Sequence, residues 1–239
     1  MRFLGRVLVV LGAMTLGSML RADSFADRLY NTGVDGSHTL ITTNALPDAH
    51  YSVVYNPPAA TSAAYVMVVG WPVGTDWLGA EGNKSRWVRP TVPTGSDQPL
   101  PVVDLAGDYL FETTFSLWGF DPDTAVIDGQ WASDNTGTKI FINGTEVKGG
   151  FGTGSPSNGF RKWTQFSILD GFVAGINKIS FLVHNDVQAT GNPAGLRVEF
   201  KTATAAVKVP EGANTLGLLL MAGGLLFLAS RRERALRWK

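Results

Sequence analysis

The sequence predicts an all-β domain, built as an antiparallel β-sandwich and flanked at each end of the chain by an apolar targeting segment. Two observations predict the sandwich. The interior of the chain contains short runs of β-branched and aromatic residues, and clusters of Gly, Pro, Asn and Asp separate these runs. In addition, residues 23–208 contain no convincing 3.6-residue pattern of an amphipathic helix.

The first 22 residues are typical of a secretory signal peptide. Arg2 and Arg6 supply the positive start, residues 7–14 are apolar, and small residues lead to Ala22. We expect a signal helix here, with cleavage after Ala22. An N-terminal anchor that is never cleaved is the alternative.

The first half of the domain predicts short strands with an irregular connection between them. Residues 31–37 are turn-rich, and residues 71–105 place tryptophans among prolines and glycines without helical periodicity. We expect strands at 39–43, 51–55 and 64–69, with a short extended run at 85–88.

The second half is more regular. Residues 107–117 alternate, so that Tyr109, Phe111, Thr113 and Phe115 share one face. Asn143-Gly144 is a strong hairpin signal, because both residues accept a positive φ. We expect further strands at 124–133, 139–142, 164–169, 178–185 and 195–204, with a tight turn at 134–137.

The stretch from Gly107 to Thr204 also resembles a known family. Gly129-Gln130-Trp131-Ala132-Ser133-Asp134-Asn135, followed by Ile140-Phe141-Ile142-Asn143-Gly144, is similar to the galactose-binding-like jelly roll. The resemblance implies a β-sandwich that serves carbohydrate binding, accessory packing in glycosidases or plain adhesion. It does not by itself name a function.

The end of the chain carries three features in a fixed order. Val209-Pro210-Glu211 comes first, an apolar segment at about 213–230 follows, and Arg231 and Arg232 open a basic stub. As a helix the apolar segment would extend roughly 27 Å, which reaches across a bilayer core. The basic stub would stay in the cytoplasm and leave the preceding domain outside.

This tail resembles the sorting signal of the bacterial PEP-CTERM class, in its Val-Pro-Glu variant. The resemblance implies secretion, transient anchoring in the inner membrane by a transmembrane helix, and recognition by an exosortase-type protease. Gly212 departs from the usual third residue of the signature, proline, which leaves the subtype of the protease open. An ordinary membrane anchor that is never cut is the alternative.

Charge and cysteine content narrow the classes of function. The signal peptide and the stub hold eight basic residues and one acidic residue; without them, the 20 of each sign become 12 basic against 19 acidic. An acidic exported domain argues against a nucleic-acid partner. The absence of cysteine excludes disulfides and thiol chemistry.

Aromatic and cationic residues of the irregular connection are the candidate ligand-binding residues. Trp77 and Trp87 could stack on sugar rings, and Arg86 and Arg89 could hydrogen-bond a hydroxylated polymer. Burial of the two tryptophans in the core is the competing interpretation. Solvated loop charges are the competing interpretation for the two arginines.

No catalytic constellation is visible. The chain has no Gly-x-Ser-x-Gly elbow and no pair of histidines at zinc spacing, so we expect no enzyme and no cofactor. Asp134 and Asn135 could hold a structural calcium ion, although turn formation explains both residues without metal.

The sequence therefore predicts a signal peptide (1–22), a β-sandwich domain (23–208) and a sorting signal (209–239). We expect an exported, non-catalytic protein of the envelope or extracellular matrix, with extracellular polysaccharide as a candidate ligand. A polysaccharide-active hydrolase and an uncleaved, membrane-anchored module that binds a partner are the alternatives.

Overall fold

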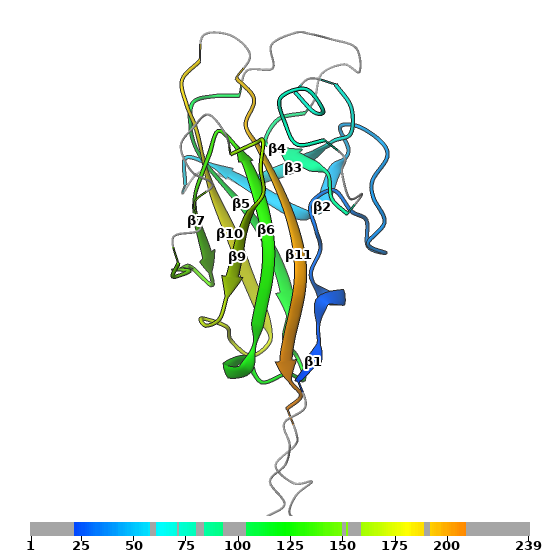
Figure 1. Cartoon of the computed structure of the whole chain (residues 1–239), viewed down its shortest axis with the longest axis vertical. Coiled ribbons are helices and arrows are strands. Elements are labelled where there is room, and N and C mark those ends of the chain that lie inside the picture. The colour runs from blue at the N-terminus through cyan, green and yellow to red at the C-terminus, as the bar shows by residue number, and fades with distance from the viewer. Residues whose placement is uncertain are drawn as a thin grey trace, which may run out of the picture.

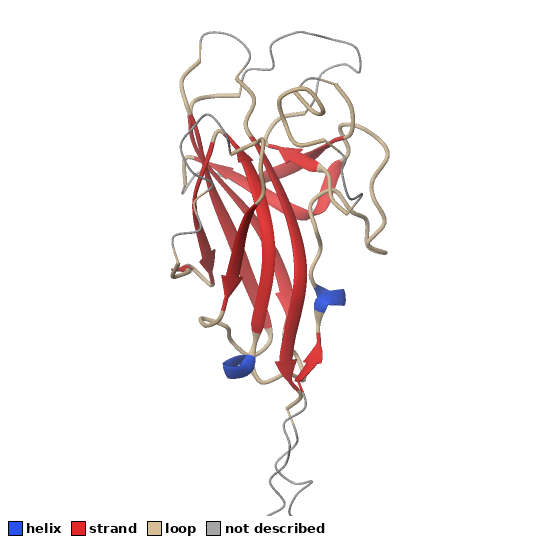
Figure 2. Cartoon of the chain, in the orientation of Figure 1, coloured by secondary structure: helices blue, strands red, loops and turns tan. Residues whose placement is uncertain are grey.

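A computed structural model describes residues 22–57, 61–70, 72–79, 84–92, 104–149, 152, 159–188 and 192–208. These residues form an all-β, antiparallel structure whose only helical elements, within the described ranges, are the 3-10 turns η1 (Ala26–Arg28) and η2 (Pro122–Thr124) (Figures 1 and 2). None of the described helices is long and apolar enough to cross a membrane.

Both expected targeting helices lie outside the described residues, apart from Ala22. The same holds for the predicted sorting residues Val209, Pro210, Glu211, Arg231 and Arg232. The predictions for these segments stay predictions.

Eleven strands form one continuous, curled sheet in the described part of the chain. Its order is β8-β7-β10-β5-β2-β3-β4-β11-β6-β9. The short strand β1 lies off this path and pairs with β11. The strands are β1 (Ala22–Ser24), β2 (Pro47–Tyr55), β3 (Thr61–Met67), β4 (Trp87–Arg89), β5 (Gly107–Ser116), β6 (Val126–Asp134), β7 (Thr136–Ile142), β8 (Thr145–Glu146), β9 (Thr164–Ile168), β10 (Ile176–Asn185) and β11 (Gly195–Ala206).

The curl brings β6 and β9 over β10, and the core lies between them. Trp131 of β6 and Phe166 of β9 contact Phe181 of β10, with ring centroids 5.4 and 5.9 Å apart. All three rings are fully buried. Gly137 is required here, because a Cβ at that position would lie 2.4 Å from the Trp131 ring.

Alternation fixes which face of each strand enters this core. In β5 the predicted inner residues Tyr109, Phe111, Thr113 and Phe115 are all buried, while the residues between them are not. The predicted Asn143-Gly144 hairpin is confirmed: φ is 50° and 83° at the two positions, and they join β7 to β8.

Two predictions about local structure need correction. The expected strand at 39–43 is absent, since Leu40 makes only an isolated bridge to Val34. The expected turn at 134–137 is shorter, because only Asn135 separates β6 from β7. These two strands do not pair: β6 pairs with β11 and β9, whereas β7 pairs with β10 and β8. Asn135 is therefore a corner at which the chain crosses between the two layers.

Strand β1 was not predicted. It consists of Ala22, the last residue of the expected signal peptide, and the two residues that follow it. Ala22, Asp23 and Ser24 pair with Ala206, Ala205 and Thr204 of β11. Cleavage after Ala22 would leave Asp23 and Ser24 in this pairing.

Candidate functional site

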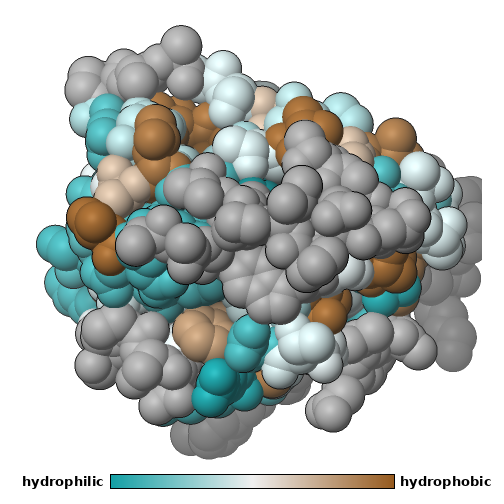
Figure 3. Space-filling model, turned by 90° about the horizontal axis from the view of Figure 1, so that it is seen from above, coloured by the Kyte–Doolittle hydropathy of each residue, from teal (hydrophilic) through white to brown (hydrophobic). Residues whose placement is uncertain are grey.

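A pocket with a volume of about 140 Å³ lies at the end of the sheet where β6 and β10 finish and β11 begins. Figure 3 looks down on this end, where hydrophobic and hydrophilic side chains are interspersed. The wall combines aromatic, carboxylate, amide and proline side chains: Pro72, Asp76, Trp77, Asp134, Asn135, Phe160, Gln188 and Pro193.

Asp134 is the chemically distinctive group of this pocket. It is the last residue of β6, directly before the corner at Asn135, and only 4% of its surface is exposed. Its Oδ2 accepts a hydrogen bond from the Trp77 indole Nε1 at 2.6 Å, whereas its Oδ1 is buried and has no hydrogen-bond partner among the described residues. A buried polar atom in this state calls for a partner beyond the described residues, such as an ordered water, an ion or a ligand.

Burial raises the pKa of Asp134 to about 7. The hydrogen bond from Trp77 opposes this shift, and the negative charges of Asp104, Asp76 and Asp186 add to it. The Asp134 carboxyl group therefore exchanges its proton near neutral pH. The ionised carboxylate can only accept hydrogen bonds. The protonated carboxyl group can also donate one.

Trp77 is held rigidly in the wall of the pocket. Its ring lies against that of Trp87 with centroids 4.3 Å apart, and the Trp87 indole donates a hydrogen bond to the Leu78 carbonyl at 3.0 Å. On the other side the backbone of Gly195 approaches so closely that a Cβ there would lie 2.4 Å from Trp77 Cη2.

We expect the substitution Gly195→Ala to destabilise the protein by about 1–3 kcal/mol. The new methyl group would push against the buried indole ring of Trp77, which cannot move freely because it packs against Trp87. Urea unfolding measures the loss. Gly36→Ala is the control, because a Cβ at Gly36 meets nothing within 4 Å. Equal unfolding free energies for the two variants would contradict this packing.

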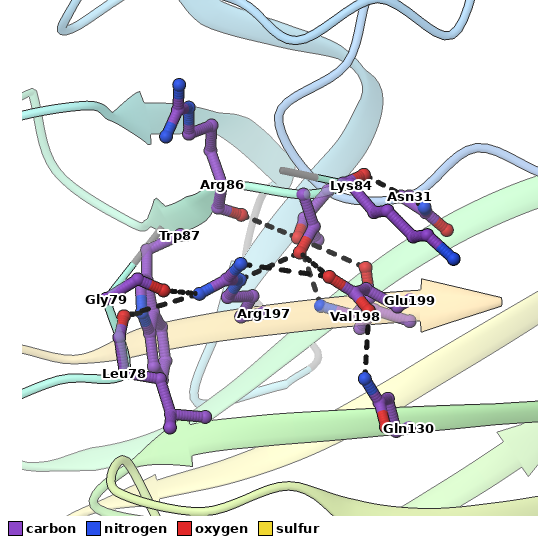
Figure 4. Close-up of polar contacts among 12 residues, drawn as sticks. Asn31, Leu78, Gly79, Lys84, Arg86, Trp87, Gln130, Arg197, Val198 and Glu199 are labelled. Atoms are coloured by element: carbon purple, nitrogen blue, oxygen red, sulfur yellow. Dashed lines mark hydrogen bonds and ion pairs between the residues drawn. The ribbon is translucent and has the colours of Figure 1, made fainter. Parts of the chain in front are cut away.

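A buried polar network anchors the segment that carries Trp77. Arg197 of β11 donates from its Nε to Ser85 Oγ at 2.7 Å and from its Nη1 to the Gly79 carbonyl, and its guanidinium lies 4.9 Å above the Trp163 ring. Glu199 accepts hydrogen bonds from Ser85 at 2.8 Å and from Gln130 at 2.8 Å (Figure 4). The network thereby connects the irregular segment to strands β6 and β11.

A buried ion pair supports the same end of the sheet. Arg89 Nη2 lies 2.7 Å from Asp104 Oδ2, and both side chains are fully buried. The same Oδ2 accepts the Ala194 N–H at 2.8 Å, and the Asp104 N–H donates to the Asn192 carbonyl at 2.7 Å. Asp104 thus connects β4 to the segment that leads into β11 and ends beside Trp77.

These contacts correct the predicted ligand-binding set. Trp77 lines the pocket, but only 3% of its surface is exposed, and Trp87 is buried. For both tryptophans the core interpretation is confirmed. Arg89 is not a solvated loop charge but one half of the buried ion pair. Arg86 is half-buried, and its backbone pairs with Thr32. Figure 4 shows the Arg86 side chain pointing away from the Arg197 network.

The calcium candidates have other partners. Asn135 Oδ1 accepts the Asp186 N–H at 2.8 Å, and Asp134 Oδ2 accepts the Trp77 indole. Of the three side-chain oxygens of these two residues, Asp134 Oδ1 is therefore the one that could still bind a metal ion. A Ca²⁺ ion takes 6–8 oxygen ligands. The described residues contain no group of three or more His, Asp or Glu side chains that could hold a metal ion.

Sequence reasoning identified three members of the pocket, Trp77, Asp134 and Asn135, but placed them in separate hypotheses. It missed Asp76, Phe160 and Gln188, which come from three different connections and share no motif. The signal that could have marked Asp134 was its position in a run of otherwise core-forming residues, where a carboxylate is unexpected.

Comparison with known proteins does not assign a family. No protein-family model matches the chain, and no curated protein matches it either. Among solved structures, the isomalto-dextranase of Arthrobacter globiformis T6 complexed with panose aligns with a TM-score of 0.30 and 14% identity, over 63% of this chain. The chain spans only 23% of that enzyme. A CBM35 from Paenibacillus barcinonensis aligns with a TM-score of 0.21 and 18% identity, over 43% of this chain and 85% of that one. Alignments at these TM-scores carry no argument about this chain.

Proposed function

We propose that this protein is an exported, non-catalytic protein of the envelope or extracellular matrix that binds a glycan in the pocket around Asp134. Its galactose-binding-like jelly-roll fold, its PEP-CTERM sorting signal and its processing by an exosortase-type protease belong to the same proposal. The observation that carries the binding function is the buried Asp134 carboxyl group, with one oxygen fixed by Trp77 and the other without a partner among the described residues.

A hydroxylated ligand matches this wall better than an apolar one. The Oδ1 atom of Asp134 can accept a hydroxyl proton, Gln188 offers a donor and an acceptor at the exposed rim, and Phe160 presents an apolar ring to C–H groups. The volume of about 140 Å³ is well below the roughly 300–1,000 Å³ of pockets that enclose drug-sized ligands. The pocket therefore suits one terminal sugar residue, or a branch, and not the middle of a polymer.

Retention of the full chain on a panel of polysaccharides tests this function. We expect the wild type to be retained on at least one polymer, and Gln188→Ala to weaken the binding about threefold to tenfold through loss of one hydrogen bond. Gln165→Ala, an exposed change of the same type on β9, serves as the control. Failure of the wild type to bind any polymer would contradict glycan binding and reduce the proposal to a structural matrix protein.

A hydrolase is the second candidate, because Asp76 and Asp134 line the same pocket and glycoside hydrolysis uses two carboxyl groups. A carboxyl group with a pKa of about 7 is suited to act as a general acid. Release of reducing sugar by the purified protein, abolished by both Asp76→Asn and Asp134→Asn, would identify this activity. Absence of release from every polymer that is bound favours the non-catalytic function.

The third candidate is an uncleaved, membrane-anchored module that binds a partner. Its covalent structure differs from that of the protein cleaved by an exosortase-type protease at the C-terminus alone. The intact mass of the mature protein distinguishes the two, because removal of residues after the Val209-Pro210-Glu211 signature deletes the apolar segment and the basic stub.

A further inference from the structure

The end of the sheet opposite the pocket carries exposed apolar side chains, which we call the basal apolar surface. They come from the turn after β5, from the connection between β9 and β10 together with the first residue of β10, and from the segment that follows β11. Their exposed fractions lie between 42% and 69%; they are Trp118, Leu169, Val173, Ile176 and Val207.

Backbone contacts hold these segments together. The Leu117 N–H donates to the Gly175 carbonyl at 2.8 Å, and a Cβ on Gly175 would lie 3.4 Å from the Trp118 ring. Phe120 forms a bridge with Val207, and the Lys208 N–H donates to the Gly119 carbonyl at 2.8 Å.

The Trp118 turn is also fixed from the side. Arg28 donates from its Nη1 to the Trp118 carbonyl at 2.8 Å and to the Ser116 carbonyl at 3.2 Å, and its guanidinium lies 4.8 Å from the centroid of the Phe120 ring. The backbone of the turn is therefore anchored while 69% of the Trp118 surface remains exposed. A rigid turn that exposes an indole ring is suited to contact another surface.

The chain continues toward the predicted membrane span from this same end. Strand β11 descends to it and β1 begins beside it (Figure 1). Only residues 209–212 separate Lys208 from the apolar segment at 213–230. Five extended residue steps cover at most about 18 Å, so an anchored chain would keep Lys208, beside the basal apolar surface, within that distance of the hydrocarbon core.

Tryptophan and aliphatic side chains at this distance suit the boundary between lipid headgroups and acyl chains. The indole ring is apolar with one polar N–H, and it concentrates in this layer of the bilayer. The same end carries Arg28 and Lys208 but also Asp121, Asp123 and Asp170, so charge attraction to anionic lipid is not the driving force.

We propose that the basal apolar surface inserts into the outer boundary of the membrane while the protein is anchored, and that it holds the domain upright with the pocket facing away. This inference rests on the proposed anchoring by the C-terminal segment. The occupant of the surface is lipid. Burial of the surface against a second copy of the chain is the competing outcome of the test.

The absence of cysteine in the sequence allows a direct measurement. Single-cysteine variants of the full chain, Ile176→Cys on the basal surface and Val187→Cys beyond β10, are labelled with an environment-sensitive fluorophore and reconstituted into phosphatidylcholine vesicles. Both native side chains are exposed, at 62% and 87%. Strand β10 separates the two sites by about 30 Å, which places Val187 out of reach of the acyl chains.

Phospholipid with brominated acyl chains should quench the label at position 176 and leave the label at position 187 unchanged. Equal quenching at the two sites, or a blue shift at 176 without quenching, which indicates a protein contact, would overturn the docking. Vesicle flotation reports the anchoring separately. Protein that floats with the vesicles but shows no quenching contradicts the docking alone, whereas protein that fails to float contradicts the anchoring and the docking together.

Discussion

The substitution Asp104→Ala is expected to lower the free energy of unfolding by about 3–5 kcal/mol. It would leave the Arg89 guanidinium fully buried without its counter-charge at 2.7 Å, and an uncompensated buried charge is among the most destabilising changes in a protein. The change would also remove the acceptors for the Ala194 N–H and the Thr91 hydroxyl. The segment that leads into β11 would lose the side-chain link that Asp104 makes between Ala194 and Arg89 of β4.

Urea unfolding measures this loss against the control Lys139→Ala. That control breaks the Lys139–Glu146 ion pair, whose side chains are 46% and 52% exposed, and we expect it to change stability by less than about 1 kcal/mol. The double variant Arg89→Met with Asp104→Leu should recover much of the loss, since it removes both buried charges. An Asp104→Ala variant as stable as the control would refute the role assigned to the ion pair.

The substitution Asp134→Asn is expected to remove a pH dependence of stability between about pH 4 and pH 7. Below the ordinary pKa of 3.8 the carboxyl group holds its proton in the folded and unfolded states alike. As the pH rises toward 7 the unfolded state releases this proton first, so the folded wild type becomes less stable. The difference between 3.8 and about 7 corresponds to roughly 4 kcal/mol.

Unfolding free energies of wild type and Asp134→Asn across this pH range test the shift. The amide keeps an acceptor for the Trp77 indole, so the variant should be the more stable protein above pH 7. Asp170→Asn, at an exposed position, is the control. Parallel profiles for wild type and Asp134→Asn would show that Asp134 titrates as an ordinary carboxyl group.

The sequence predicted the strands well wherever local pattern decides structure. The alternation in β5 identified the buried face, because a side-chain period of two leaves only one register that buries Tyr109, Phe111 and Phe115 together. The Asn143-Gly144 turn was equally local, since positive φ angles select these residue types.

Long-range packing decided what the sequence could not predict. Trp77 and Trp87 lie in a segment without periodicity; Trp77 packs in the space left by Gly195, more than a hundred residues later, and Trp87 packs against Trp77. The partner of Arg89 is Asp104, and the partner of Asp134 is Trp77; no motif connects either pair. The corner at Asn135 looked like a tight turn because a turn and a crossing between layers use the same residue types.

The two ends of the domain differ in chemistry. One end holds a small pocket with a titrating carboxyl group, and at the other end the exposed indole of Trp118 lies on an anchored turn where the chain leaves toward its predicted membrane span. In the proposed arrangement the first end faces outward to a glycan and the second faces the lipid. In that arrangement the separation would keep the proposed binding site free while the protein is anchored.

The central claim is that a glycan binds beside Asp134, and the indole N–H resonances of the protein test it most directly. In the ¹⁵N-labelled protein, an oligosaccharide from a retained polymer should shift the signal of Trp77, whose Nε1 donates to Asp134, and leave that of Trp118 at the opposite end in place. Saturable binding that leaves the Trp77 signal unmoved would contradict the assignment of the site.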